Sequence, residues 1–235
     1  SSPFWNPSAT PYTMYLDYTM ALARQNWADW APFSSTRTYQ RWLACEQRTY
    51  QRANHLFCMS HLVKTSLVEE YSVPADNITV VGSSGNFERL YDGDKRFGSQ
   101  QILFNGSDFF RKGGDRVLAA FTRVRAALPD ASLVVIGAKL AEVPPGVINP
   151  GAVDADTLRH LFLSSDLVVA PGRCDPFPTF LMEAMNYGVP CIVSAQDGMP
   201  EIVDDGLNGR VLAQPNPDNL ARELVSLMRQ PTQLR

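Results

Sequence analysis

The chain has 235 residues, of which 45% are hydrophobic, and this suits one large domain or two smaller ones with a sizeable core. Its formal net charge of −3 gives no case for binding to nucleic acid, and no apolar run approaches the ~20 residues of a membrane span. The four cysteines form no Cys-x-x-Cys pair, so we expect reduced, mostly buried thiols in a cytoplasmic protein. Because Ser1 is neither an initiator Met nor the start of a leader, we expect part of a longer protein.

Residues 1–88 are predicted to be the remainder of a Rossmann-like α/β domain. The expected elements are a strand at 14–16, a helix over 36–52, a strand at 55–59, a helix after the capping residue Ser60 and a strand at 78–81. Aromatic side chains crowd residues 4–42, and we expect them to fill a core or a domain interface rather than to stack on sugars. The stretch 82–101 is rich in Gly, Ser and charged residues, which predicts a linker, placed at 89–101.

Residues 102–235 are predicted to form a second, more complete domain. Strands are expected at 102–105, 133–136, 167–170 and 191–193, with helices at 117–128, from the cap Asp156 to 164, around Glu183 and at 218–229. Continuous apolar strands that alternate with helices are typical of a parallel sheet covered on both faces. The predicted fold class is therefore α/β, with a doubly wound, Rossmann-like parallel sheet in this second domain.

A loop with two cations follows the first strand of this second domain. It runs from Gly106 to Gly114 and contains Arg111, Lys112 and Gly113 just before a helix. Glycines let a backbone approach closely, amides at a helix N-terminus attract phosphate, and cations neutralise its charge. The pattern is compatible both with a diphosphate site and with a solvated surface turn.

Two acids flank the start of a later helix. Asp175 lies in the loop after the strand 167–170, and Glu183 lies eight residues on, in the otherwise apolar Leu-Met-Glu-Ala-Met. A carboxylate in such a helix needs partners, and open α/β sheets bind ligands just past the carboxyl ends of their strands. The pair indicates a ligand with several hydroxyls and a central anion. The alternative is a loop acid and a helix-face acid without a shared function.

Five motifs occur in order along the second domain. They are Arg111-Lys-Gly-Gly, Asp175-x7-Glu183, Glu-Ala-Met-x-x-Gly-Val-Pro190, Gly198-Met-Pro-Glu-Ile-Val203 and Asp205-Gly-x-Asn-Gly209. Together they resemble the retaining GT-B glycosyltransferases of glycosyltransferase family 4, well over residues 102 to about 230 and loosely over 46–86. The resemblance implies a GT-B-like fold. It also implies transfer of a sugar from a nucleotide-diphosphate sugar to an acceptor hydroxyl, with retention and without a metal or other cofactor.

The resemblance further implies roles for individual residues. Lys112 and Arg111 would hold the diphosphate, while Glu183 would meet the nucleotide ribose and Asp175 the donor sugar. The remaining donor-binding residues would be Gly106, Gly113, Phe177, Pro178, Thr179 and Phe180, and the stretch 137–150 would approach the base. The implied donor is a UDP-, GDP- or ADP-sugar. The acceptor stays open among saccharide, lipid and protein, with peripheral contact at the inner face of a membrane as one option.

Three positions depart from the family pattern. Asp175 stands where the family usually has Glu, Pro178 where it commonly has Gly, and Ser107 where a second arginine is often found. Pro178 has no N–H to donate, whereas Thr179 offers a hydroxyl. These departures concern the sugar side of the site. Most of the family's first domain, with its usual active-site His, has no counterpart in residues 1–88, which leaves open whether this segment is active alone.

Two alternatives to a transferase remain. A non-catalytic nucleotide-sugar binding module is compatible with the shortened first domain. A glycoside hydrolase could use Asp175 and Glu183 as a pair of acids ~5–9.5 Å apart, but it would need no diphosphate site at Arg111 and Lys112. Two Asp-x-Asp triplets match the motif of metal-dependent transferases without its buried strand and nucleotide loop, so we predict no metal site.

Overall fold

The computed structural model describes residues 10–230 and divides the chain into two compact units, one that ends at Ser83 and one that begins at Ser84. Part of the predicted aromatic cluster, from Phe4 to residue 9, lies outside the described residues.

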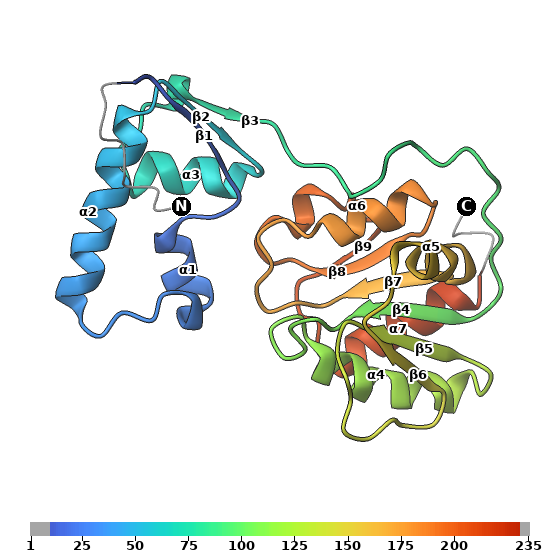
Figure 1. Ribbon diagram of the computed structural model, residues 1–235. Helices are drawn as coiled ribbons and strands as arrows, with labels where there is room; N and C mark the ends of the chain where they lie inside the picture. The colour runs from blue at the N-terminus through green and yellow to red at the C-terminus, as the bar shows by residue number, and fades with distance from the viewer. Residues whose placement is uncertain (1–9, 231–235) are drawn as a thin grey trace. The chain divides into compact units, whose positions relative to one another are not determined.

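The first unit is a three-stranded parallel sheet with helices between its strands (Figure 1). In chain order its elements are β1 (Thr13–Leu16), α1 (Met20–Asn26), the 3-10 helix η1 (Ala28–Trp30), α2 (Thr36–Arg52), β2 (His55–Cys58), α3 (His61–Glu69), the 3-10 helix η2 (Ala75–Asn77) and β3 (Ile78–Val80). The strand β2 lies in the middle and pairs in parallel with both neighbours. Ser60 caps α3 by accepting a hydrogen bond from the N–H of Val63, as the sequence predicts.

Only one face of this small sheet is well buried. Its core residues from the strands are Leu16, Leu56, Cys58 and Ile78. They alternate with Tyr15, which is 52% exposed, and with the half-buried Phe57. Because successive side chains of a strand point to opposite faces, the described residues leave the second face of the sheet open. Two members of the predicted aromatic cluster, Tyr12 and Tyr18, pack against the core, in agreement with one of their two expected roles.

The second unit is a six-stranded, all-parallel sheet in the order β6-β5-β4-β7-β8-β9. In chain order its elements are β4 (Gln101–Asn105), α4 (Gly114–Ala127), β5 (Ser132–Ile136), β6 (Val147–Gly151), α5 (Ala155–Ser164), β7 (Leu167–Ala170), α6 (Thr179–Asn186), β8 (Cys191–Ser194), the 3-10 helix η3 (Met199–Glu201), β9 (Gly209–Leu212) and α7 (Pro217–Met228). The strand order reverses between β4 and β7, which makes this pair the topological switch point of the sheet.

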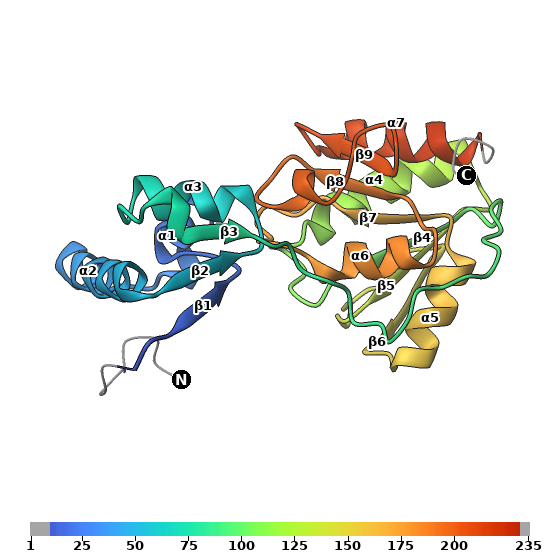
Figure 2. The ribbon, with the colours of Figure 1, turned by 90° about the horizontal axis from the view of Figure 1, so that it is seen from above.

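Helices cover both faces of this larger sheet. Helices α4 and α7 pack on one face, with Phe121 and Leu224 against strand residues such as Phe104. Helices α5 and α6 pack on the other, with Phe162 and Leu181 in a second core. Figure 2 shows the two pairs of helices on opposite sides of the strands. The doubly wound parallel sheet predicted from the sequence is therefore confirmed.

The segment that leads into β4 is hydrogen bonded to the rest of the second unit. The N–H of Tyr91 donates to Asn186 Oδ1 at 3.1 Å, and the Lys95 ammonium donates to carbonyl groups at the end of α5. The buried carboxylate of Asp166 accepts from the backbone N–H groups of residues 98–100. The predicted linker at 89–101 thus makes repeated polar contacts with helices α5 and α6.

Two local expectations need correction. The N-cap of α5 is Asp154 rather than Asp156, because the side chain of Asp154 accepts the N–H of Thr157 at 2.8 Å while Asp156 lies within the first turn. The sequence also gave no signal for β6. That strand contains Pro150 and lies at the edge of the sheet, where a residue without an N–H is tolerated.

Candidate functional site

The two loops at the switch point come close to each other. One follows β4 and contains residues 106–113, and the other follows β7 and contains residues 171–178. Because β4 and β7 are parallel neighbours, both loops leave from the same edge of the sheet. A small cavity between them is lined by Phe104, Asn105, Lys112, Val169, Ala170, Gly172, Asp175, Pro178, Phe180, Leu181 and Met199. Open α/β sheets bind ligands in this position.

Glycines shape the first loop. Gly113 is the N-cap of α4 with a left-handed backbone (φ 81°), and a Cβ at this position would lie 2.5 Å from the carbonyl oxygen of Pro171. Only glycine combines this conformation with so close an approach to the second loop. Gly106 donates its N–H to Ile136 O at 2.8 Å, and a Cβ there would contact Phe104 and Phe109. The two glycines thus set the path of the loop that carries the cations.

An ion-pair cluster joins the two loops. Lys112 Nζ lies 3.1 Å from Asp175 Oδ2, and Arg111 Nη1 lies 3.7 Å from the same oxygen. Arg111 also donates to Asp108 Oδ2 and to Cys174 O, each at 2.6 Å, and only 8% of it is exposed. The structure therefore brings together three of the four residues predicted to carry the chemistry, and it places one carboxylate between two cations.

The second loop is fixed from two sides. On the side of α4, the N–H of Arg173 donates to Arg111 O at 2.8 Å. The guanidinium of Arg173 forms two hydrogen bonds with Asp115, and they hold the pKa of that carboxyl below its usual value. On the side of β8, Ser194 Oγ donates to Gly172 O at 2.7 Å. The loop that carries Asp175 is thus part of a rigid hydrogen-bonded frame.

Asp197 contributes to this frame, and the sequence did not single it out. Its Oδ2 accepts the N–H of Asp175 at 2.8 Å, although Asp197 has a left-handed backbone (φ 50°). The next residue, Gly198, donates its N–H to Pro176 O at 3.0 Å, and a Cβ there would lie 2.2 Å from the same oxygen. The Gly-Met-Pro-Glu motif that begins at Gly198 therefore lets the chain after β8 touch the Asp175 loop.

Helix α6 begins directly after this loop. Pro178 is its N-cap and gives no side-chain hydrogen bond to the first turn, which starts at Thr179. The helix N-terminus therefore has no capping side chain, and its residues Pro178 and Phe180 line the same small cavity as Lys112 and Asp175. Phe180 is buried against Phe162 with ring centroids 5.2 Å apart, and Phe177 is half-buried. Phe180 packs in the core through its side chain, so only its backbone is available to a ligand.

Glu183 lies on the second turn of α6 and is 8% exposed. Its Oε1 accepts two hydrogen bonds from Asn86, one from the backbone N–H at 3.0 Å and one from Nδ2 at 2.8 Å. Asn86 is the partner that a buried carboxylate needs, and it was not among the predicted site residues.

Of the segment 137–150, predicted to approach a base, the part that directly follows β5 lies at the same edge of the sheet, and residues 147–150 belong to β6. Asn149 organises it, because its Oδ1 accepts the N–H of Leu140 and its Nδ2 donates to Val135 O and Ala138 O. Within residues 10–230, no group of three His, Cys, Asp or Glu side chains is placed to hold a metal ion. In the same residues, none of the helices is both long and apolar enough to cross a membrane.

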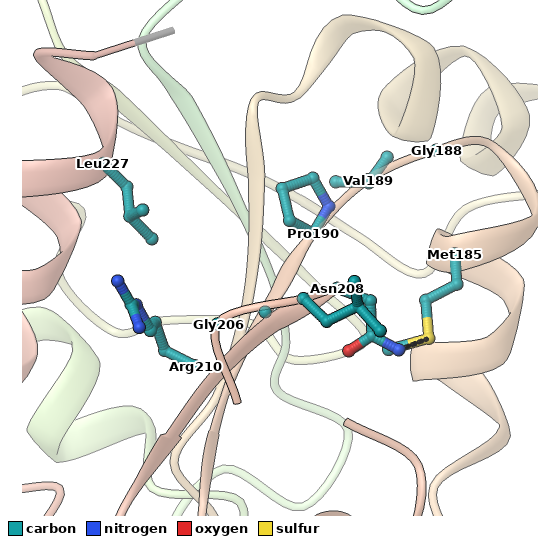
Figure 3. Close-up of a pocket in the computed structure, with 10 residues that line it drawn as sticks. Met185, Gly188, Val189, Pro190, Gly206, Asn208, Arg210 and Leu227 are labelled. Carbon is teal, nitrogen blue, oxygen red and sulfur yellow. Dashed lines mark hydrogen bonds between the residues drawn. The ribbon is translucent and has the colours of Figure 1, made fainter. Parts of the chain in front are cut away.

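A larger hollow lies at the opposite edge of the sheet, at the amino ends of β8 and β9 (Figure 3). It is lined by Met185, Gly188, Val189, Pro190, Gly206, Leu207, Asn208, Gly209, Arg210 and Leu227. Arg210 is the one residue of this lining with a charged side chain. The hollow thus lacks the acids and the helix N-terminus found at the switch point, which remains the candidate site.

Comparison with known proteins finds a family model and several related sequences. A family model described as glycosyl transferases group 1 matches residues 92–235. An uncharacterised glycosyltransferase of Methanocaldococcus jannaschii is 29% identical over 192 residues, which cover 70% of this chain and 49% of that protein. The phosphatidyl-myo-inositol mannosyltransferase of Propionibacterium freudenreichii is 34% identical over 130 residues, which cover 53% of this chain and 34% of that protein.

A solved structure shares the fold. The Anabaena protein HepE, in complex with UDP and glucose, aligns with a TM-score of 0.72 and 17% identity, over 95% of this chain and 63% of that one. At this identity the likeness concerns the fold alone. The chain spans about half or less of the length of the two relatives above.

Proposed function

The chain belongs to the group 1 glycosyl transferases, and on this premise we propose that it binds a nucleoside diphosphate sugar at the switch point. Its fold is the α/β, Rossmann-like GT-B fold of its structural neighbours. In the proposed reaction the whole enzyme transfers the sugar to an acceptor hydroxyl with retention and without a metal. The residues from 84 onward supply the donor side.

The ion-pair cluster is the observation that carries this proposal. Two cations, Arg111 and Lys112, contact the carboxylate of Asp175. This cluster lies next to the N-terminus of α6, which no side chain caps. A diphosphate offers several anionic oxygens to the same cations and to the first amides of α6. During transfer, the bond from the sugar to the diphosphate breaks and a bond to the acceptor oxygen forms. The fixed cations would then stabilise the charge that develops on the leaving diphosphate.

The two acids take different parts in the proposal. Glu183 would accept hydrogen bonds from ribose hydroxyls and Asp175 would face the donor sugar, with residues 137–150 near the base. The contacts of Asp175 support a role tied to the diphosphate, because Lys112 links this acid directly to the proposed phosphate site. The complex of HepE with UDP supports a nucleotide donor, and the choice among UDP-, GDP- and ADP-sugars is left to experiment.

The alternative functions have less support. A glycoside hydrolase needs a pair of acids but no diphosphate site, so it leaves Arg111 and Lys112, the two cations on Asp175, without a role. A non-catalytic binding module would use the same donor site. It would differ from a transferase only in that the sugar is bound but not transferred to an acceptor. We further propose a cytoplasmic protein, with a saccharide, lipid or protein acceptor.

A binding experiment tests the donor site. Thermal shift with UDP, GDP, ADP and their sugars should identify the nucleotide that raises the melting temperature, and calorimetry should then measure its affinity. We expect Lys112→Ala to weaken this affinity by at least about tenfold, equivalent to ~1.4 kcal/mol. Arg159→Ala removes an exposed cation on α5 and should leave the affinity unchanged. The absence of binding by the unmodified chain would reject the donor site. Unchanged affinity in Lys112→Ala would remove that residue from it.

A further inference from the structure

Asn86 is exposed, yet it donates two hydrogen bonds to a buried acid. Its backbone N–H and its side-chain Nδ2 both reach Oε1 of Glu183, at 3.0 and 2.8 Å. Two amide donors on one oxygen restrict the rotation of a carboxylate about its last bond. Within the described residues, Oε2 of Glu183 accepts no hydrogen bond, so one oxygen is held while the other is available to a ligand.

The approach of this segment to α6 depends on a glycine. A Cβ at Gly85 would lie 2.8 Å from Glu183 Cγ and 2.9 Å from the Glu183 backbone nitrogen. The chain can therefore bring Asn86 to the acid only because the preceding residue has no side chain. One helical turn further on, the N–H of Tyr91 donates to Asn186 Oδ1 at 3.1 Å and holds the same segment along the helix. The Asn86 contact thus belongs to an ordered stretch of chain.

We propose that Asn86 is a positioning residue that orients Glu183 toward the hydroxyl pair of a ribose. This inference rests on the proposed function, in which Glu183 meets the nucleotide ribose. With Oε1 held by Asn86, Oε2 is directed to the ligand before the ligand arrives, and less rotational freedom is lost on binding. A site built around hydroxyl donors discriminates against ligands that lack them. Asn86 therefore sets the preference for ribonucleotides over deoxyribonucleotides.

Calorimetry with two ligands separates this role from a structural one. The ligands are the nucleoside diphosphate that the unmodified chain binds best and its 2′-deoxy form. We expect the unmodified chain to prefer the ribonucleotide by about tenfold or more, and Asn86→Ala to reduce this preference to less than about threefold. The affinity for the deoxy form should fall less, because that ligand has lost one of the two hydroxyls that Glu183 would meet. Asn54→Ala, at an exposed asparagine of the first unit, should keep the preference.

Two further variants keep the test independent of folding. Asn86→Asp has the same shape but places a second carboxylate beside Glu183, and it should lose the preference at an unchanged melting temperature. In the double variant with Glu183→Ala, the effects should not add, because both changes remove one interaction. Unchanged preference in Asn86→Ala, or equal losses for both ligands, would overturn the inference while the donor site stands. A chain that binds neither nucleotide would overturn the proposed function together with this inference.

Discussion

The two units contain the same kinds of elements but differ in how their sheets are covered. In the first unit, β2 alternates half-buried and buried residues, whereas in the second unit β7 and β8 bury nearly all of theirs. Helices on both faces of a parallel sheet hold the loops at its carboxyl edge from two sides. The ion pair of Lys112 with Asp175 lies at such an edge. Coverage of both faces is therefore what turns the loop ends of the second unit into a fixed site.

Alanine substitution of one phenylalanine in a middle strand of each unit should give the largest difference in the free energy of unfolding. Phe104 of β4 is 1% exposed, and Phe57 of β2 is half-buried on the open face. We expect Phe104→Ala to lower the free energy of unfolding of the second unit by about 3–5 kcal/mol. We expect Phe57→Ala to lower the free energy of unfolding of the first unit by less than about 1.5 kcal/mol, because Phe57 buries less apolar surface on folding than Phe104 does. Urea denaturation followed by circular dichroism measures both. Equal losses would show that the open face is covered in solution.

Two acids with different partners extend the comparison, with a smaller expected effect on stability. Asp175 in the second unit has cations as partners, whereas Glu46 in the first accepts from the hydroxyls of Tyr71 at 2.6 Å and Tyr50 at 3.2 Å. We expect Glu46→Ala to cost about 1–3 kcal/mol, because it leaves buried hydroxyls without their acceptor. Burial raises the pKa of Glu46 above its usual value, and the hydrogen bond from Tyr71 opposes this effect.

The raised pKa of Glu46 determines how the stability of the first unit changes with pH. A carboxyl whose pKa is raised by folding contributes stability below the ordinary glutamate pKa, and the contribution is lost as pH rises through the raised value. The first unit should therefore lose stability relative to Glu46→Gln as the pH rises above the ordinary glutamate pKa of about 4. Denaturation at a series of pH values measures the difference, with Glu69→Gln, at an exposed position, as the control. A constant difference between wild type and Glu46→Gln would mean that Glu46 titrates as it does in the unfolded chain.

Local patterns predicted most of the elements. The bounds of α2 and β7 agree with the sequence prediction. A long polar helix and a short apolar strand can both be recognised from the composition of their own residues. Asp154 and Asp156 are both good caps two residues apart, and the sequence alone does not decide between them. The strand β6 has no apolar run, and only its pairing with β5 defines it.

The candidate site was predicted in part, for a similar reason. Arg111, Lys112, Asp175 and Glu183 were found because each lies in a motif. Asn86 was missed as a site residue because its partner is 97 positions away and the stretch around it predicts a linker. Asp197 was missed because a loop acid gives no sign that its carboxylate will accept a distant N–H. Contacts between remote loops follow from the winding of the sheet, which the individual motifs do not contain.

Substitution of one lysine in each unit should give the smallest difference in the free energy of unfolding. Lys95 Nζ donates to Phe162 O, Leu163 O and Ser165 O, at 2.9, 2.7 and 2.5 Å, where α5 ends. Among the described residues, Lys64 Nζ donates to a single carbonyl, Ile78 O, at 3.0 Å. The last carbonyls of a helix have no partner within the helix, and a cation there also favours the helix dipole.

We expect Lys95→Met to lower the free energy of unfolding of the second unit by about 1–2 kcal/mol, and Lys64→Met to lower that of the first by about 0.5–1 kcal/mol. Methionine keeps most of the apolar stem, so the difference reports the ammonium contacts. Thermal unfolding of the two variants measures it. An equal or larger loss in Lys64→Met would mean that the ammonium contacts of Lys95 contribute little to the second unit. The segment that precedes β4 would then be held mainly by its other hydrogen bonds, those of Tyr91 to Asn186 and of residues 98–100 to Asp166.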